Sequence, residues 1–231
     1  SSAGGRVNWP AFNRSATGRI TGIWRGELVT LDISTEQPLF LMAGGTAPLK
    51  LSLQSAPLTG SFEGIANLSG DTHFDGNASL SSPSLRRILE WSRADIVPGA
   101  VVGSVSLESQ LSGSLGRLKL VNTTLTLEQN RGTGTLEMAL WQPVPSITGT
   151  LAFETMDLRS FLSAFSALTP DAFGRYRTID ARAADQIALD LRLSATRATA
   201  GSIDFTDLAA TAQVKPGLAA FDISDAGAFG G

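Results

Sequence analysis

Apolar residues alternate with polar or small residues along most of this chain, and this period of two constrains the fold more than any other feature. In residues 187–193 every odd position is Ile or Leu, while Asp190 and Arg192 occupy even positions. Because successive side chains of a β-strand point to opposite faces, such a segment forms a strand with one apolar face. Similar runs, bounded by Gly, Pro, Ser or Asn, predict about a dozen strands.

One run changes its phase. Leu118 and Leu120 occupy even positions, whereas Leu125 and Leu127 occupy odd positions. A strand that kept its register would turn one of these pairs toward the opposite face of the sheet. The change of phase therefore predicts a β-bulge or a tight turn at residues 122–124.

Two segments replace the period of two by apolar spacings of three and four, which are typical of an amphipathic helix. In the first, Ser82 as the capping residue and Pro83 as the first helical residue predict a helix over about 83–93. In the second, Asp157 as the cap predicts a helix over about 157–168.

The two predicted helices belong to a quasi-repeat. One constant shift places Leu85-Arg86 on Leu158-Arg159 and also places Gly76 on Gly149. Each unit consists of alternating strands, a strand that begins near Gly, and then the short helix. The units cover roughly residues 49–91, 118–165 and a truncated 203–231. Repeats of this length indicate an extended, stacked architecture in which neighbouring units bury each other's apolar faces.

We therefore expect a mainly β fold, namely an extended, curled antiparallel β-sheet or taco-like groove built from quasi-repeats, with the two short helices. Residues 1–231 are expected to form a single β-rich repeat region excised from a longer protein, because the sequence starts without a signal-like segment and stops inside the third unit. The same alternation is compatible with an open groove and with a filled core, so both remain open at this point.

The composition excludes several classes of function. Without Cys and with one His, the chain can form no disulfide, thiol nucleophile, thiolate metal site or His cluster. Its net charge of −3 and scattered basic residues argue against nucleic acid as a partner. No nucleotide-binding loop and no nucleophile-elbow motif is present, so we expect neither a cofactor nor enzymatic activity.

Several polar residues allow a functional and a structural interpretation. His73 lies between Asp71 and Asp75, which suggests a base with an orienting carboxylate, but a polar turn is favoured because no nucleophile motif accompanies it. Two loose groups of aspartates lack the loop of a calcium site and are interpreted as solvated: Asp180, Asp185 and Asp190, and Asp204, Asp207, Asp222 and Asp225.

Tryptophans and two arginines also have alternative interpretations. The four tryptophans could form a membrane-interface belt, but strand-end caps are favoured: Trp9, Trp24, Trp91 and Trp141. Arg86 and Arg159 occupy the same position in two repeat units. They could meet a phosphate headgroup, although a structural ion pair near each helix is favoured.

Alternating strands of this kind give a sheet with one apolar face and one face rich in hydroxyl groups. Residues on the apolar face either pack into a closed core or line an open groove. The candidate groove residues, which become lipid-binding candidates through the family resemblance described next, are Leu107, Leu111, Leu118, Leu120, Leu136, Met138, Leu151, Phe153, Leu189 and Leu191.

The stretch from Asp75 to Phe165 resembles the AsmA-like proteins, the AsmA and TamB group of Gram-negative envelope proteins. The likeness lies in the strand Gly76–Leu80, the helix Leu85–Leu89 and the helix start Met156–Arg159. It continues over Asp185–Leu193, Gly201–Leu208 and Phe221–Gly231. The resemblance implies the C-terminal periplasmic region of a protein that an N-terminal transmembrane helix, absent from this sequence, anchors in the inner membrane.

The resemblance further implies a protein that binds or conducts phospholipid along an apolar β-groove and serves outer-membrane lipid homeostasis. Phospholipid acyl chains are then the expected partner, together with the inner or outer membrane or envelope assembly proteins. The alternative is an interaction or scaffold module that assists outer-membrane protein assembly by offering open strand edges to a partner.

Overall fold

The computed structural model describes residues 3–11, 14–70, 72–92, 103–166, 188–215 and 218–228. The strands are β1 (Ala3–Asn8), β2 (Ala16–Trp24), β3 (Glu27–Thr35), β4 (Ala47–Gln54), β5 (Thr59–Asn67), β6 (His73–Ser82), β7 (Val105–Ser114), β8 (Arg117–Leu127), β9 (Asn130–Ala139), β10 (Ser146–Asp157), β11 (Ala188–Ala200), β12 (Ile203–Lys215) and β13 (Leu218–Ala228). The helices are α1 (Pro38–Met42), α2 (Leu85–Ser92) and α3 (Leu158–Ser166).

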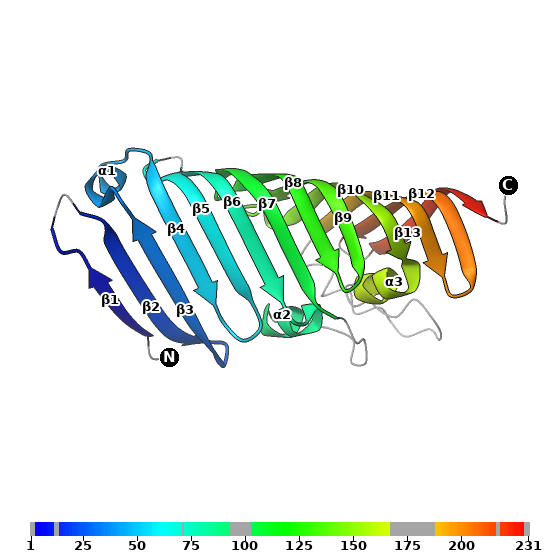
Figure 1. Ribbon diagram of the computed structural model, residues 1–231, viewed down its shortest axis with the longest axis horizontal. Helices are drawn as coiled ribbons and strands as arrows, with labels where there is room; N and C mark the ends of the chain where they lie inside the picture. Colours follow the sequence, from blue (N-terminus) through cyan, green and yellow to red (C-terminus); the bar gives the residue numbers. More distant parts are fainter. Residues whose placement is uncertain are drawn as a thin grey trace.

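All thirteen strands form one sheet, in which the spatial order of the strands is their order in the sequence. The sheet curls without closing, and β1 and β13 form its two ends (Figure 1). This arrangement confirms the predicted mainly β fold built on one curled sheet. We call the edge that carries α1 the upper rim and the edge that carries α2 and α3 the lower rim, as oriented in Figure 1.

Neighbouring strands are antiparallel with one exception, because β10 and β11 run parallel. Ser146 pairs with Ala188, so both strands start at the upper rim. The connection over 158–187, which includes α3, therefore joins the lower end of β10 to the upper end of β11. The sheet is thus mostly antiparallel, as predicted, and the one parallel pair is joined by a long connection because parallel neighbours need a crossover in place of a hairpin.

The predicted phase change in β8 is a β-bulge. The pairing of β8 with β9 shifts between Leu120 and Thr123, and Asn122 adopts a φ of 51°. Asn tolerates this left-handed conformation better than most residues. The extra residue restores the register, so Leu120 and Leu127 are both buried on the same side of the sheet.

Both predicted helices form at the lower rim, but the cap of α2 differs from the expectation. Helix α2 begins at Leu85, and Ser84 Oγ accepts the Arg87 N–H at 3.4 Å. Ser82 Oγ instead accepts the Ser84 N–H at 3.1 Å, in the turn before the helix. The cap is therefore Ser84 and not Ser82, since Pro83 precedes the first turn. The predicted ends of both helices, after residues 92 and 166, lie outside the described residues.

The cap of α3 is the predicted one. Asp157 Oδ1 accepts the N–H groups of Arg159 at 2.9 Å and Ser160 at 3.4 Å, and Oδ2 accepts the Ser160 hydroxyl at 2.7 Å. The Ser160 hydrogen bond is the main cause that lowers the pKa of Asp157. Burial acts in the opposite direction, while the backbone hydrogen bonds and the nearby Arg159 charge lower the pKa further.

Helix α1 was not predicted from the sequence. It spans five residues, with Pro38 in its first turn and Leu41 buried against the sheet. A helix of little more than one turn presents too few apolar residues to establish a spacing of three and four.

The structure reproduces the order of elements that the quasi-repeat predicts. Strands β4, β5 and β6 followed by α2 match strands β8, β9 and β10 followed by α3. Arg86 and Arg159 are each the second residue of their helix, as the sequence shift requires.

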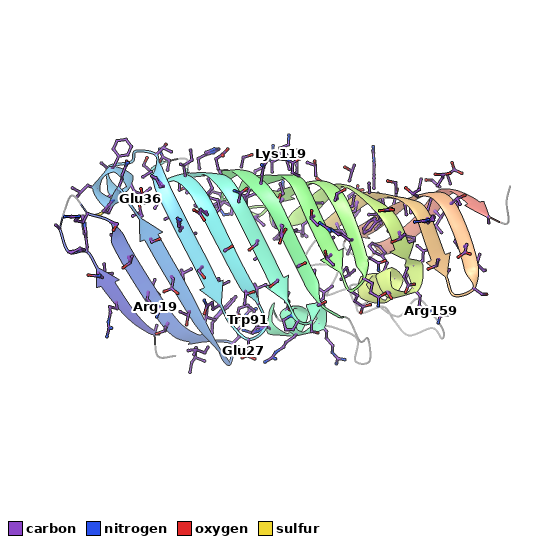
Figure 2. The ribbon with its side chains drawn as sticks, viewed as in Figure 1. Arg19, Glu27, Glu36, Trp91, Lys119 and Arg159 are labelled. Atoms are coloured by element: carbon purple, nitrogen blue, oxygen red, sulfur yellow. The ribbon has the colours of Figure 1, made fainter. Side chains whose placement is uncertain are left out.

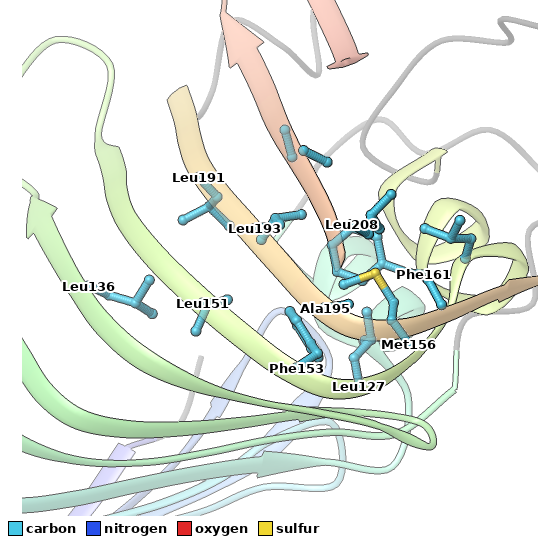
Figure 3. Packing of buried hydrophobic residues seen from close by; sticks show 14 of the residues in the cluster. Leu127, Leu136, Leu151, Phe153, Met156, Phe161, Leu191, Leu193, Ala195 and Leu208 are labelled. Carbon is cyan, nitrogen blue, oxygen red and sulfur yellow. The ribbon is translucent and has the colours of Figure 1, made fainter. Parts of the chain in front are cut away.

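The hydrophobic core forms two clusters. The larger one joins the strands from β8 onward to α3 (Figure 3), and the smaller one lies beneath α1 around Leu49 and Phe62. Within the described residues, the C-terminal half of the sheet is therefore the more deeply packed half.

Candidate functional site

One face of the sheet carries most of its large apolar side chains, and all ten predicted groove residues lie on it. The register fixes this placement, because residues directly opposite each other on neighbouring strands share a face. Leu111 pairs with Leu120, which pairs with Leu136 on the next strand. Leu107 reaches Phe153 in the same way through two intervening partners. We call this side the apolar face and the other side the polar face.

The pairs link into rows that cross the sheet from strand to strand. The first row is Leu49, Gly64, Gly76, Leu111, Leu120, Leu136, Gly149, Leu191, Ala212 and Phe221. The second row is Gly5, Ile20, Leu31, Leu53, Gly60, Leu80, Leu107, Leu125, Gly132, Phe153, Ala195 and Leu208. Neither row contains a polar side chain, so the apolar surface is continuous across these strands.

Exposure along the second row falls from the N-terminal to the C-terminal half. In the second row, Ile20 is 48% exposed and Leu80 is 45% exposed, whereas Phe153 is only 3% exposed. The other large side chains of this row that precede Phe153 are half-buried, namely Leu31, Leu53, Leu107 and Leu125. The second row is therefore partly open to solvent over β2–β7, whereas Leu49 and Phe62 on the same face are buried beneath α1, and the face is covered from β8 onward.

Of the ten predicted residues, only Leu107 and Leu111 lie on β7 in the open region, and the other eight lie on β8–β11 in the covered region. Leu120, Leu136, Leu151, Phe153 and Leu191 are buried in the larger cluster. The other five are half-buried, and among them Leu111 packs beside the smaller cluster. The alternation identifies the face correctly but carries no information on which strands remain uncovered. The more exposed positions Ile20 and Leu80 were therefore not among the predicted groove residues.

Helix α3 and the curl of the sheet cover the C-terminal half. The Phe161 ring lies 6.0 Å from the Phe153 ring of β10 and 6.0 Å from the Phe221 ring of β13. Figure 3 shows Phe161 and Met156 over Leu208 and Ala195 inside the curl. Edge-to-face contacts of this kind add to the hydrophobic contribution of the buried area.

Helix α2 crosses the lower rim of the open half. Three strand spacings of about 4.8 Å, or about 14 Å, separate β6 from β3, and a helix of eight residues covers about 12 Å of this distance. At the far end the Trp91 ring meets the Trp24 ring with centroids 4.4 Å apart, and Trp91 Nε1 donates to the Trp24 carbonyl at 3.0 Å. Arg87 pairs with Glu27 at 3.0 Å. These contacts fix α2 to the β2–β3 turn (Figure 2).

A polar pair interrupts the middle of the apolar face. Ser109 and Thr123 are buried at the bulge between β7 and β8, and their hydroxyl oxygens lie 2.9 Å apart. Ser109 also donates to the Val121 carbonyl at 3.0 Å. Because these hydroxyls satisfy each other and the bulged backbone, their burial carries little cost.

The polar face carries ion pairs and hydroxyl groups. Arg19 Nε donates to Asp32 Oδ1 at 2.6 Å, and Lys50 Nζ lies 2.6 Å from Glu63 Oε1. In each pair the hydrogen bond to the carboxylate, followed by its charge, raises the pKa of the cation. Both cations are exposed, so these pairs contribute little to stability. A shallow depression of about 850 Å³ lies over them across β1–β5.

The other sequence candidates do not assemble into a site. His73 is exposed at the first residue of β6, and Asp71, Asp180 and Asp185 lie outside the described residues. Within the described ranges, no three acidic or His side chains converge on a position for a metal ion. None of the described helices has the length and hydropathy needed to span a membrane.

Comparisons of the chain with protein-family models, with curated proteins and with solved structures find no match. The resemblance to the AsmA-like proteins therefore rests on the sequence pattern alone and stays a prediction. The open apolar stretch over β2–β7 is the feature of the fold with the clearest capacity to bind a ligand.

Proposed function

We propose that this chain binds or conducts phospholipid acyl chains along the open part of its apolar face. In this proposal it is the periplasmic region of an AsmA-like protein, anchored in the inner membrane, that serves outer-membrane lipid homeostasis. The observation that carries the binding proposal is the second apolar row, which stays half-open over β2–β7. The assignment to the AsmA-like group rests on the sequence resemblance.

The open stretch has suitable dimensions for an acyl chain. Six strands from β2 to β7 span five spacings of about 4.8 Å, or about 24 Å across the strands. One leaflet of a bilayer has an apolar thickness of about 15 Å. Each methylene removed from water contributes about 0.8 kcal/mol, so a dozen methylenes contribute on the order of 10 kcal/mol before the costs of binding. An acyl chain could thus be held by surface contact without any single essential residue.

Native mass spectrometry after purification without detergent tests this proposal. We expect phospholipid to copurify with the chain at a stoichiometric level. The double variant Ile20→Asp/Leu80→Asp places two charges on the open rows at positions that are already half exposed. A carboxylate beside an acyl chain is not compensated, so bound lipid should fall about tenfold or more.

The polar face provides a matched control. Ile23 and Ile65 are about as exposed as Ile20 and Leu80 but point to the opposite side, as their pairing with Leu28 and Asp75 shows. The variant Ile23→Asp/Ile65→Asp should retain its lipid. Lipid-free wild-type protein, or equal loss of lipid in both folded variants, would refute the proposal.

A second function is favoured by the ends of the sheet. All six residues of β1 are exposed, β1 has no Pro, and Arg6 is its one charged residue. Such an edge lacks the usual protection against pairing with another strand. We propose as the alternative that the chain is an interaction module for outer-membrane protein assembly. Binding of an unfolded β-barrel protein to lipid-free chain, abolished by the edge substitution Val7→Pro, would support it.

A further inference from the structure

The connections at the upper rim carry an unusual number of exposed apolar side chains. Turns normally consist of polar residues and Gly. Yet each upper connection from β3 to β10 exposes at least one large apolar residue, and Met42 and Trp141 reach 77% and 75% exposure. The residues are Leu39, Phe40 and Met42 in α1, Leu68 after β5, Leu115 after β7 and Trp141 after β9. At the lower rim, the β4–β5 and β8–β9 turns expose none, whereas Ile23, Trp24 and Leu28 are exposed beside the β2–β3 turn.

These residues form two rigid groups, which we call knobs. The first knob consists of Leu39, Phe40, Met42 and Leu68, and the second consists of Leu115 and Trp141. In the first knob, Asn67 Nδ2 and Ser69 Oγ donate to the Gly44 carbonyl at 2.9 Å and 3.2 Å, which ties α1 to the turn that carries Leu68. The Phe40 ring covers Gly45 in the same loop. The first knob therefore presents its apolar side chains on a fixed backbone.

The second knob is held together in a similar way. The Leu140 N–H donates to the Gly116 carbonyl at 3.0 Å, which joins the β9–β10 connection to the β7–β8 turn. The Trp141 ring lies against Gly116, so it stands beside Leu115. Four strand spacings, or about 19 Å, separate β4 from β8 and hence the two knobs along the rim.

We propose that the upper rim docks on the surface of a lipid bilayer, with the two knobs inserted between headgroups. Two separated groups of apolar side chains on one straight edge suit a planar, deformable surface. A specific protein partner would instead need a contiguous patch of about 800 Å². Trp, Phe, Met and Leu on a fixed edge are side chains that enter the interfacial region of a membrane.

The charges at this rim favour an anionic bilayer. Arg14, Arg117 and Lys215 lie in the upper connections or at the strand ends beside them, against Glu36 and, in the sequence, Asp71. Lys119 also projects at this rim (Figure 2), and Glu137 lies directly opposite it on β9. Among these residues the basic side chains exceed the acidic ones by one, whereas the whole chain carries a net charge of −3. Basic side chains next to apolar ones match anionic headgroups above an acyl layer.

This inference deepens the proposed function and rests on it, because it names the partner from which the open apolar face would receive lipid. The lower rim carries α2 and α3, whereas the upper rim presents the knobs (Figure 1). A bilayer at the upper rim would therefore meet the ends of β2–β7 on the side away from these two helices.

Sedimentation with vesicles of phosphatidylethanolamine and phosphatidylglycerol tests the docking. We expect wild-type chain to sediment with the vesicles, and the variant Met42→Ser/Trp141→Ser to bind at least about tenfold more weakly, since both exposed side chains would enter the interface. The control Ile23→Ser/Leu28→Ser removes exposed apolar residues at the lower end of the polar face and should bind like wild type. Trp141→Phe should also lose most of the blue shift in Trp emission on binding.

Wild-type chain that stays in the supernatant would overturn the inference, as would equal binding by the two double variants. Self-association that the Met42→Ser/Trp141→Ser variant abolishes without vesicles would also overturn it, because the rim would then serve a second copy. Failure of the two proposals can be separated. If docking alone is wrong, wild type still copurifies with lipid; if acyl binding alone is wrong, wild type is free of lipid after purification but still sediments with vesicles.

Discussion

Two glycines on neighbouring strands allow a close approach of the backbones within the first apolar row. Gly64 and Gly76 face each other across β5 and β6. A Cβ on Gly64 would collide with the Asp75 carbonyl oxygen, and a Cβ on Gly76 would collide with the Glu63 carbonyl oxygen. The sequence marks such glycines as breaks in the alternation. It does not reveal that they lie directly opposite each other, because register depends on the fold.

We predict that Gly64→Ala destabilises the chain by about 1–3 kcal/mol, because the new methyl group overpacks a backbone contact. Urea unfolding followed by circular dichroism measures the effect. Gly18 is the matched control, since it also lies on the apolar face but has open space around its Cβ position. Gly18→Ala should leave stability unchanged or raise it by up to about 1 kcal/mol. Equal effects at both positions would contradict the role assigned to Gly64.

At the scale of elements, the sequence predicts type better than boundaries. The spacing of apolar residues identifies α2 and α3, and the odd and even positions locate the bulge in β8. Helix α2 begins later than the sequence predicts because a serine stands on each side of Pro83 as a possible cap. Ser84, and not Ser82, accepts the Arg87 N–H of the first turn. Helix α1 is not predicted because its five residues are too few to show the apolar spacing of a helix.

The Asp157 cap gives a prediction for α3. Asp157→Ala removes three acceptor contacts at the first turn and should lower the free energy of unfolding by about 1 kcal/mol at pH 7. Since folding lowers the pKa of Asp157 below 3.8, its carboxylate stabilises the fold above that pH. The stabilisation is lost as the pH falls through the lowered pKa.

Denaturant titrations from pH 7 to pH 2.5 check both parts. The difference between wild type and Asp157→Ala should shrink below about pH 4, where the carboxylate becomes protonated. Asp204 is an exposed aspartate in β12 and serves as control, with an expected change within about 0.5 kcal/mol on substitution by Ala. A gap between wild type and Asp157→Ala that is absent at pH 7 would contradict the capping role.

At the scale of the whole molecule, the alternation determines a sheet with two unlike faces but not how that sheet curls. The placement of Leu107 and Leu191 on one face follows from parity within strands and from register between them. Their burial depends on α3 and on the parallel neighbours β10 and β11, which depend on the long connection between them. The open half over β2–β7 therefore emerges only in three dimensions.

The central claim is that acyl chains contact the apolar face over β2–β7. Photolabelling with a phospholipid that carries a diazirine near the end of its acyl chain, followed by peptide mass spectrometry, tests it most directly. We predict labels on apolar-face residues such as Leu31, Leu53 and Leu80. Labels concentrated instead on their polar-face neighbours Thr30 and Ser52, or labelling no stronger than in urea-unfolded chain, would contradict the account.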